Sequence, residues 1–269
     1  MSMSYWQEKV VIVTGASRGF GKVLAGSFAE AGASVVLAAR GGEPLEAAAE
    51  GARRRGGQAL AVPTDVTDQS QVEAMIAATI EQFGRIDALV NNAGRSPRGD
   101  LAHTTAEDFG ELMELNLLGA VRCTQAALPH LLAARGHVVN IGSLASKAAA
   151  RWGGAYSATK FALAAYSQQL RMELEDDGLH VLLVCPGPIA GNNPRERSEE
   201  ELAGLPSAAR QPGSGARLKR LAPEQVAAEV LRACQRRRKE LIIPWRARLL
   251  FVLSAVSPNW GDWLLRKMT

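Results

Sequence analysis

Cysteine is scarce in this chain of 269 residues, which contains only Cys123, Cys185 and Cys234. The three are far apart in the sequence, and none belongs to a Cys-x-x-Cys pattern, so neither a disulfide framework nor a zinc site is favoured. We therefore expect no metal ion. Free thiols in this number are typical of a protein that works in a reducing compartment, and we expect a cytoplasmic location.

Long apolar runs are also missing. The longest late run, from Leu249 to Val256, is far shorter than the ~20 residues that a membrane-spanning helix needs. Near the beginning, Lys9 leads directly into a strand-like run, without the charged and apolar regions of a secretory signal. The sequence therefore predicts neither a membrane span nor a signal peptide.

Charge is nearly balanced, with a formal net charge of +4 at pH 7. The excess comes partly from two basic runs, residues 53–55 and 236–239, and both lie near expected helix ends, where cations complement the helix dipole. No aromatic residues interleave them, so we interpret both as solvated helix ends and expect no nucleic-acid partner.

Short apolar runs rich in β-branched residues alternate with helix-like segments along the chain. Such runs are typical of strands that are buried on both faces of a parallel sheet. Expected strands lie at 9–14, 34–39, 58–62, 86–90, 136–143, 179–184 and 240–243. We find no internal repeat or linker, so the sequence predicts one α/β domain over residues 1–269.

A glycine-rich turn follows the first expected strand. It reads Thr14-Gly-Ala-Ser-Arg-Gly-Phe-Gly21 and leads into a helical pattern that stops near Gly32. Glycines allow a tight turn and let backbone N–H groups approach a pyrophosphate at the helix N-terminus. Strand, turn, helix and second strand occur in the order of a dinucleotide site, which favours nucleotide binding over a merely structural turn.

The second strand ends at Arg40, without the acidic residue that holds the adenosine ribose of NAD. Arg18 in the glycine turn is expected to approach from the other side. Two guanidinium groups near one ribose favour NADP(H) over NAD(H), although either arginine could be a solvated surface residue. Asp65, at the end of the third strand, is assigned to the adenine edge, and Asp68 is an expected N-cap.

Polar residues follow the central strands. Residues 91–94 read Asn-Asn-Ala-Gly, where the amides could brace the strands and approach the cofactor or could belong to a simple turn. Asn116 interrupts an apolar helical pattern over residues 105–132, and a lone buried amide is more often structural than catalytic. Ser143 ends the fifth strand, at the kind of edge where open α/β sheets carry active sites.

Tyr156 and Lys160 are one helical turn apart, on an expected helix that runs to about Asp177. The Lys160 charge would sit beside the Tyr156 hydroxyl, favour its phenolate form and make it a proton donor at neutral pH. The spacing alone is equally compatible with a surface pair.

The ordered set of these motifs resembles the short-chain dehydrogenases/reductases over residues 8 to about 245. Its members are Thr14-Gly-x-x-x-Gly-x-Gly21, Asn91-Asn-Ala-Gly94, Asn116, Ser143, Tyr156-x-x-x-Lys160 and Pro186-Gly187. The resemblance implies a Rossmann-type, doubly wound sheet of seven parallel strands in a three-layer α/β/α arrangement. It also implies the catalytic tetrad Asn116, Ser143, Tyr156 and Lys160.

In that family-based interpretation, Ser143 holds the substrate oxygen, Tyr156 transfers the proton, and Lys160 holds the nicotinamide ribose. Asn116 positions a water that links Lys160 to solvent. The expected cofactor-binding residues are Gly15, Ser17, Arg18, Gly19, Phe20, Gly21, Arg40, Asp65, Val66, Asn92, Ala93, Gly94, Tyr156, Lys160, Pro186, Gly187 and Ile189. The family usually carries a threonine where this chain has Gly191, and Asn192 could substitute for it.

The predicted function is NADP(H)-dependent interconversion of a ketone or aldehyde and an alcohol. The alternatives are a non-catalytic cofactor sensor or scaffold, and a membrane-surface reductase of lipid-like ketones. Residues 190–222 are interpreted as a flexible lid, with a disordered excursion as the competing interpretation. The amphipathic tail, about 245–269, suggests a subunit contact or peripheral membrane attachment. We favour packing on protein, in a homodimer or homotetramer.

Overall fold

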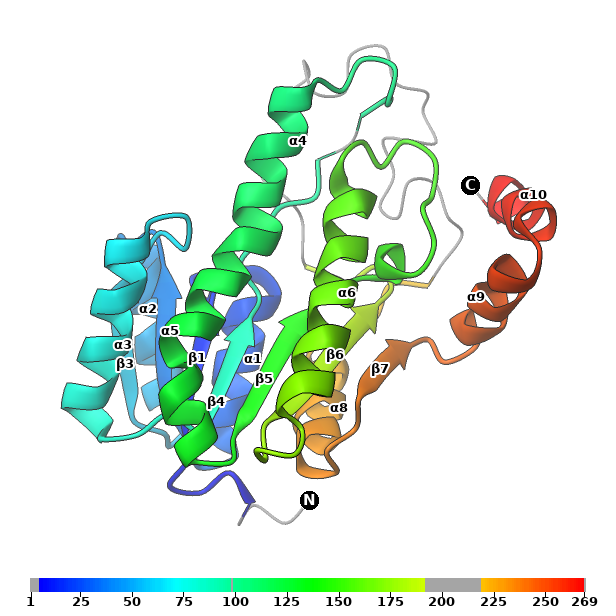
Figure 1. The fold of residues 1–269 in the computed structure, drawn as a ribbon. Helices are drawn as coiled ribbons and strands as arrows, with labels where there is room; N and C mark the ends of the chain where they lie inside the picture. Colours follow the sequence, from blue (N-terminus) through cyan, green and yellow to red (C-terminus); the bar gives the residue numbers. More distant parts are fainter. Residues whose placement is uncertain (1–4, 98, 192–218, 269) are drawn as a thin grey trace.

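The structure is a computed structural model that describes residues 5–97, 99–191 and 219–268 (Figure 1). Seven parallel strands form one sheet in the order β3-β2-β1-β4-β5-β6-β7, which confirms the predicted doubly wound Rossmann-type topology. The strands are β1 (Val10–Thr14), β2 (Ser34–Ala39), β3 (Ala59–Pro63), β4 (Ala88–Asn91), β5 (His137–Ile141), β6 (His180–Pro186) and β7 (Glu240–Ile243). The strand order reverses between β1 and β4, and open α/β sheets bind ligands at such a point, outside the carboxyl ends of the strands.

Helices cover both faces of the sheet, in three layers. The helices α1 (Gly19–Glu30), α2 (Glu43–Arg53) and α8 (Pro223–Gln235) pack on one face, and α3 (Gln69–Phe83), α5 (Gly119–Ala133) and α6 (Tyr156–Leu174) pack on the other. Two apolar cores result, one on each side of the strands. Every residue of β1 is buried, as expected for an apolar run that contributes side chains to both cores.

Several elements begin or end a few residues from their predicted bounds, for example β4 at Ala88–Asn91 against 86–90 and β5 at His137–Ile141 against 136–143. Two segments differ further. The helical segment expected over residues 105–132 consists of α4 (Ala106–Met113), the π-helical turn η2 (Glu114–Leu118) and α5. Strand β6 continues past its predicted end to Pro186, because Cys185 and Pro186 pair with Ile242 and Ile243 of β7.

Asp68 is the N-cap of α3, as predicted. Its Oδ1 accepts hydrogen bonds from the backbone N–H groups of Ser70 and Gln71, at 2.9 and 3.3 Å. These bonds satisfy two donors that the first helical turn leaves open. The cap therefore defines where the β3–α3 connection ends, next to the carboxyl edge.

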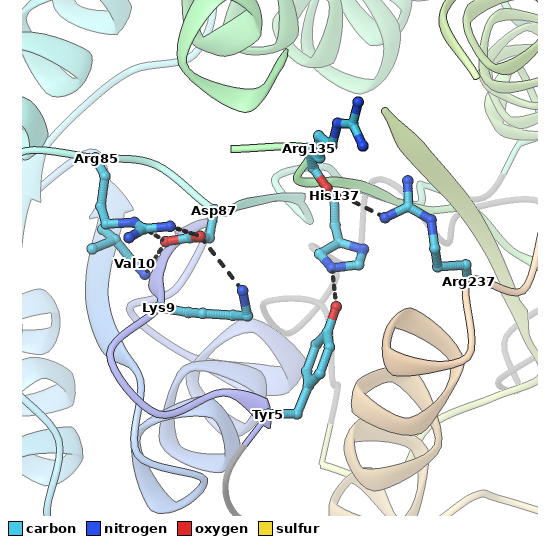
Figure 2. A network of polar contacts seen from close by, with 8 residues as sticks. All are labelled: Tyr5, Lys9, Val10, Arg85, Asp87, Arg135, His137 and Arg237. Atoms are coloured by element: carbon cyan, nitrogen blue, oxygen red, sulfur yellow. Dashed lines mark hydrogen bonds and ion pairs between the residues drawn. The ribbon is translucent and has the colours of Figure 1, made fainter. Parts of the chain in front are cut away.

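The amino edge of the sheet carries a polar network (Figure 2). The buried carboxylate of Asp87 accepts from the Val10 backbone at 2.9 Å and from the Arg85 guanidinium at 2.7 and 2.8 Å. Lys9 Nζ lies 3.6 Å from the same carboxylate. Charge-assisted hydrogen bonds thus connect β1 to the start of β4 at this edge. The residues predicted to form the active site lie at the opposite, carboxyl edge.

The tail forms two further helices, α9 (Ala247–Val256) and α10 (Pro258–Met268), which stand off to the side of β7 in Figure 1. Ala247 and Phe251 pack against the cluster of Leu183, Cys185 and Ile242, but no residue of α9 is fully buried. Within the described residues, no helix combines the length and apolarity that crossing a bilayer requires.

Candidate active site

The glycine turn has the backbone that its sequence demands. Gly15 and Gly19 have φ values of +64° and +54°, in the left-handed region that favours glycine. A Cβ on Gly21 would lie 2.3 Å from the Gly15 carbonyl oxygen and 2.4 Å from Asn92 Nδ2. A Cβ on Gly15 would likewise lie 2.9 Å from Ala93 Cα, so the packing requires glycine at both positions.

Two further expected cofactor residues flank the helix start. Arg18 is the N-cap of α1 and forms no side-chain capping bond, so the first N–H groups of this helix are not capped by that side chain. Phe20, the second residue of α1, is buried in the core behind the turn. Together with Ser17, which is partly exposed, they surround a helix N-terminus that can accept an anion.

Thr14 joins the glycine turn to the segment after β4. Its Oγ1 accepts from the N–H groups of Asn92 and Ala93, each at 3.0 Å, and donates to the Val90 carbonyl at 3.3 Å. Asn92 Nδ2 donates in return to the Thr14 carbonyl at 2.9 Å. The predicted bracing by the amides is therefore present, and it aligns two strand ends at the switch point.

Arg18 and Arg40 are both exposed, and neither forms an ion pair with another described residue. Their segments are joined, because the Ala16 N–H donates to the Ala38 carbonyl at 3.2 Å. Both guanidinium groups therefore belong to the β1–β2 end of the carboxyl edge, where an adenosine ribose lies in dinucleotide sites.

Asp65 and Val66 follow β3 at the same edge. Asp65 Oδ1 accepts from the Thr67 N–H at 3.0 Å and from the Thr67 hydroxyl at 2.8 Å, which forms an Asx turn. Val66 is buried, and a Cβ on Gly119 would lie 2.7 Å from its Cγ2. The side chains are thus used within the fold, and their predicted contact with the adenine stays a prediction.

Asn116 lies in the π-helical turn η2 and is buried. Its Oδ1 accepts from the Arg95 N–H at 3.0 Å, while Nδ2 donates to the Arg95 carbonyl at 3.0 Å and to Thr159 Oγ1 at 3.1 Å. Both amide hydrogens are used, so the side chain connects the end of the Asn-Asn-Ala-Gly segment to α6. π-helical turns of this kind often occur at functional sites.

Lys160 is buried on α6, and its Nζ lies 5.8 Å from the centre of the Tyr156 ring. Nζ donates a hydrogen bond to the Ile141 carbonyl at 2.7 Å. Burial lowers the pKa of Lys160 from 10.5 to about 8, because the ammonium loses its hydration. Lys160 thus lies close to the Tyr156 ring and is buried rather than on the surface, and the expected contact with the Tyr156 hydroxyl stays a prediction.

Ser143 follows β5 and caps the short helix η3 (Leu144–Ser146), which packs against α6. Its Oγ accepts from the Ala145 N–H at 3.1 Å. Because Lys160 holds the carbonyl of Ile141, two residues before Ser143, the serine and the Tyr156–Lys160 pair belong to the same strand end. The structure thus brings these three predicted residues to one edge, with Asn116 connected through Thr159.

The segment after β6 contributes the remaining predicted contacts. The Gly187 N–H donates to the Ile243 carbonyl at 2.7 Å, and Ile189 forms an isolated bridge with Leu221. Pro186 and Gly187 therefore lie at the carboxyl edge. Most of the expected lid and the substitute contact Asn192 fall outside the described residues. Gly191 has a φ of +70°, which favours glycine at this position.

The sequence interpretation missed a buried amide network behind the site. Asn91 Nδ2 donates to Thr124 Oγ1 at 3.0 Å and to Asn140 Oδ1 at 2.9 Å, and Asn140 Nδ2 donates to Ser167 Oγ at 2.8 Å. The chain links β4 and β5 to α5 and α6. A polar residue in the middle of an apolar strand, Asn140, was the signal that could have indicated it.

The sequence of this chain is similar to those of known proteins. The family model described as short chain dehydrogenase matches residues 9–202. The chain is 40% identical over 185 residues to the L-fucose dehydrogenase of Oryctolagus cuniculus, a match that covers 67% of this chain and 63% of that protein. The chain thus spans less than two thirds of that relative. It is also 31% identical over 268 residues to the ketoacyl reductase HetN of Nostoc sp., covering 96% of this chain and 88% of the relative.

Solved structures agree on the fold. A short chain dehydrogenase/reductase from Burkholderia phymatum, in complex with NAD, superposes with a TM-score of 0.83 at 26% identity, covering 94% of this chain and 95% of that one. An alcohol dehydrogenase from Thermococcus sibiricus, complexed with 5-hydroxy-NADP, superposes with a TM-score of 0.72 at 28% identity, covering 87% and 95%. The two neighbours thus carry different nicotinamide cofactors.

Proposed function

Because this chain belongs to the short-chain dehydrogenase/reductase family, we propose that it is an NADP(H)-dependent oxidoreductase that interconverts a ketone or aldehyde and an alcohol. The observation that carries the proposal is the buried Lys160 ammonium, 5.8 Å from the Tyr156 ring at the end of β5. A proton donor with an adjacent cation, at the edge where a dinucleotide binds, is what carbonyl reduction requires.

The residues at the carboxyl edge fit a dinucleotide. The glycine turn and the start of α1 leave backbone N–H groups open to a pyrophosphate, and side chains are excluded there. Asn92, Ala93 and Gly94 would line the ribose, while Gly187 and Ile189 would line the nicotinamide end. When bound, the cofactor supplies or accepts the hydride.

The chain's own residues manage the proton and the substrate oxygen. The Tyr156 hydroxyl donates its proton to the carbonyl oxygen in reduction and takes it back in oxidation. Ser143 accepts from Ala145 through Oγ, which leaves its O–H to donate to the same substrate oxygen. Lys160 favours the phenolate, and Asn116 positions the Arg95 backbone against α6.

The Tyr156→Phe variant tests this mechanism. It should lower kcat for ketone reduction at least a thousandfold, because it removes the proton donor and little volume, in an assay of NADPH consumption over a panel of ketones and aldehydes. Tyr166→Phe is the matched control, since it removes the same group from the same helix. Activity that survives Tyr156→Phe would overturn the mechanism, and cofactor binding without turnover on any carbonyl would favour the sensor.

The cofactor preference is tested at Arg40. NADPH should bind more tightly than NADH, because Arg18 and Arg40 are exposed where the 2′-phosphate would lie. Arg40→Asp should narrow or reverse that difference by about tenfold or more, measured by titration of both cofactors. Arg54→Asp, an exposed position on the neighbouring helix region, is the control. Equal affinities in the unmodified chain would contradict the preference.

The assembly and the compartment are part of the same proposal. Phe161 and Met172, 44% and 73% exposed, lie eleven residues apart on α6 and hence on one face, which supports a homodimer or homotetramer through that helix. The three cysteines are free and buried, which supports a cytoplasmic location.

A further inference from the structure

Exposed apolar side chains are concentrated in one part of the molecule. Among the described residues, seven of the eleven large apolar side chains that are exposed lie between residues 245 and 263. They are Trp245, Leu249, Val252, Leu253, Val256, Trp260 and Trp263. We call residues 245–268, with α9 and α10, the tail hairpin. Exposed apolar patches of this kind mark sites that bind another protein, a membrane or a ligand.

Helix α9 has two apolar faces, and only one of them is used by the fold. Ala247 and Phe251 face the sheet, where they pack against Leu183, Cys185 and Ile242. Leu249, Val252, Leu253 and Val256 follow the i, i+3, i+4, i+7 spacing that places side chains on a single helix face. Val252 and Val256 are 60% and 72% exposed, so this second face points away from the protein.

The two helices of the hairpin are already joined to each other. Gly261 of α10 is buried against Ser254 of α9, and a Cβ on this glycine would lie 2.6 Å from Ser254 Oγ. On the outer side, Leu253, Trp260, Trp263 and Leu264 line a shallow apolar hollow. The two helices thus pack closely against each other, and the apolar stripe of α9 continues onto α10.

The hairpin is also cationic. It carries Arg246, Arg248, Arg266 and Lys267 against a single acidic residue, Asp262, a net charge of +3. All four basic side chains are exposed, and Lys267 Nζ lies 5.1 Å from the centre of the Trp263 ring. A tryptophan with a cation over its ring suits a boundary between a lipid headgroup layer and acyl chains.

We propose that the tail hairpin attaches this protein to an anionic lipid surface, with α9 and α10 lying in the headgroup layer. Its aromatic and aliphatic face would enter the acyl boundary, and its basic residues would contact the lipid phosphates. A second copy is a poorer occupant, because a symmetric contact through this face would bring the basic residues of both chains together with only Asp262 to neutralise them.

The hairpin leaves the sheet at the edge that carries the candidate site. Strand β7 ends at Ile243, whose carbonyl accepts from the Gly187 N–H, and α9 begins four residues later. In Figure 1 the hairpin stands to the side of β7, clear of the remaining helices. Attachment would therefore hold the carboxyl edge close to the lipid surface without burying the sheet.

Co-sedimentation of the full chain with vesicles tests the proposal. Vesicles of phosphatidylcholine alone are compared with vesicles that also contain phosphatidylglycerol, at low and high salt. We expect binding at least tenfold tighter to the anionic vesicles, and weaker binding at high salt because the charges are exposed. Brominated lipids should quench tryptophan fluorescence, and Trp260→Phe/Trp263→Phe should remove most of that quenching.

Two pairs of variants separate the contributions. Trp260→Ser/Trp263→Ser should weaken vesicle binding about tenfold or more, because apolar area no longer leaves water. Arg248→Ala/Lys267→Ala should weaken it about twentyfold on anionic vesicles only, since each basic residue contributes about fivefold. The controls are Leu101→Ser, at an apolar position outside the tail hairpin that is 65% exposed, and Arg54→Ala, and both should bind within twofold of the unmodified chain.

Three results would overturn the proposal. One is a full chain that stays in the supernatant with both kinds of vesicle, and another is equal binding by the tryptophan variant. The third is a lipid-free dimer, seen by analytical ultracentrifugation, that the tryptophan changes convert to monomer, which would assign the face to a second copy. Cofactor turnover on a water-soluble ketone, measured in parallel, reports on the proposed function independently of attachment.

Discussion

The Lys160 ammonium is buried with a backbone carbonyl, that of Ile141, as its hydrogen-bond acceptor. Its pKa, lowered to about 8 by burial, corresponds to a cost of about 3 kcal/mol for keeping the charge in the folded protein at neutral pH. At this residue, the requirements of the proposed chemistry and of stability therefore oppose each other.

Lys160→Met should make the protein more stable and inactive. Removing the buried charge recovers about 3 kcal/mol, while the Ile141 carbonyl loses its donor at a cost of about 1–2 kcal/mol, so the free energy of unfolding should rise by about 1–2 kcal/mol. Urea unfolding at pH 7 measures this difference.

The difference should shrink as the pH rises from about 8 towards 10.5, because the folded protein has by then released the proton while the unfolded chain still binds it. A variant that is less stable than the unmodified chain at pH 7 would show that the charge is compensated by partners other than Ile141.

At the scale of elements, a chain of hydrogen bonds connects the N-terminal segment to β5, β6 and the turn before β7. The Tyr5 hydroxyl lies 2.7 Å from His137 Nε2 (Figure 2). His137 Nδ1 lies 2.8 Å from His180 Nδ1, and His180 Nε2 lies 2.8 Å from the Arg238 carbonyl. Since the carbonyl can only accept, His180 must donate from Nε2, and its Nδ1 then accepts from His137 Nδ1. His137 Nε2 in turn accepts from the Tyr5 hydroxyl, and both imidazoles are neutral.

Cys234 belongs to the same cluster, and the ligand atoms of His137, His180 and Cys234 lie within 4.8 Å of one another. The 2.8 Å contact between the two Nδ1 atoms is a hydrogen bond that the tautomers above complete. The cluster is therefore explained as a structural connection, and residues this far apart in the sequence offered no metal-like spacing.

Acid should destabilise the protein through this pair. Burial lowers the pKa of His137 to about 3 and that of His180 to about 4, below the ordinary 6.5, so the unfolded chain binds protons that the folded protein excludes. Above pH 6.5 the two histidines make their full contribution to the free energy of unfolding. This contribution is lost as the pH falls below 6.5, by about 2 kcal/mol for each histidine at pH 5.

Urea unfolding at pH 7 and pH 5 measures that loss. His103→Gln is the control, because this histidine is exposed and lies outside the hydrogen-bonded chain of Tyr5, His137 and His180. Equal stability of the unmodified chain at both pH values would show that the folded protein holds neither imidazole neutral.

At the scale of the whole molecule, the sheet and its two helical layers carry the cores, and the tail hairpin adds little to them. Only Ala247 and Phe251 of α9 are packed against a core cluster. The molecule therefore combines a body that buries its apolar surface with an appendage that exposes it.

Removing residues 257–269 should change the free energy of unfolding of the body by less than about 1 kcal/mol, because α10 contacts α9 rather than the sheet. Removing residues 246–269 should lower the free energy of unfolding by about 2 kcal/mol more, because the apolar residues that Phe251 covers become exposed. Thermal and urea unfolding of both truncated chains check the difference. Loss of folding when only residues 257–269 are removed would show that the tail hairpin stabilises the sheet.

Local patterns predicted most of the fold and most of the candidate site. Apolar, β-branched runs indicated all seven strands, and Asp68 indicated the start of α3, because burial and capping depend on neighbouring residues. The π-helical turn at Asn116 was not predicted, since its backbone depends on the long-range bonds to Arg95 and Thr159. The extension of β6 likewise depended on pairing with β7.

By itself, the sequence determined the family, the order of strands and helices, and the residues that gather at the carboxyl edge, because these follow from periodicity and from motifs of fixed spacing. Only the tertiary structure decided that Lys160 is buried, that His137 meets His180, and that the apolar stripe of the tail faces outward. Each of these depends on which distant segment packs against a residue, and no local pattern records that.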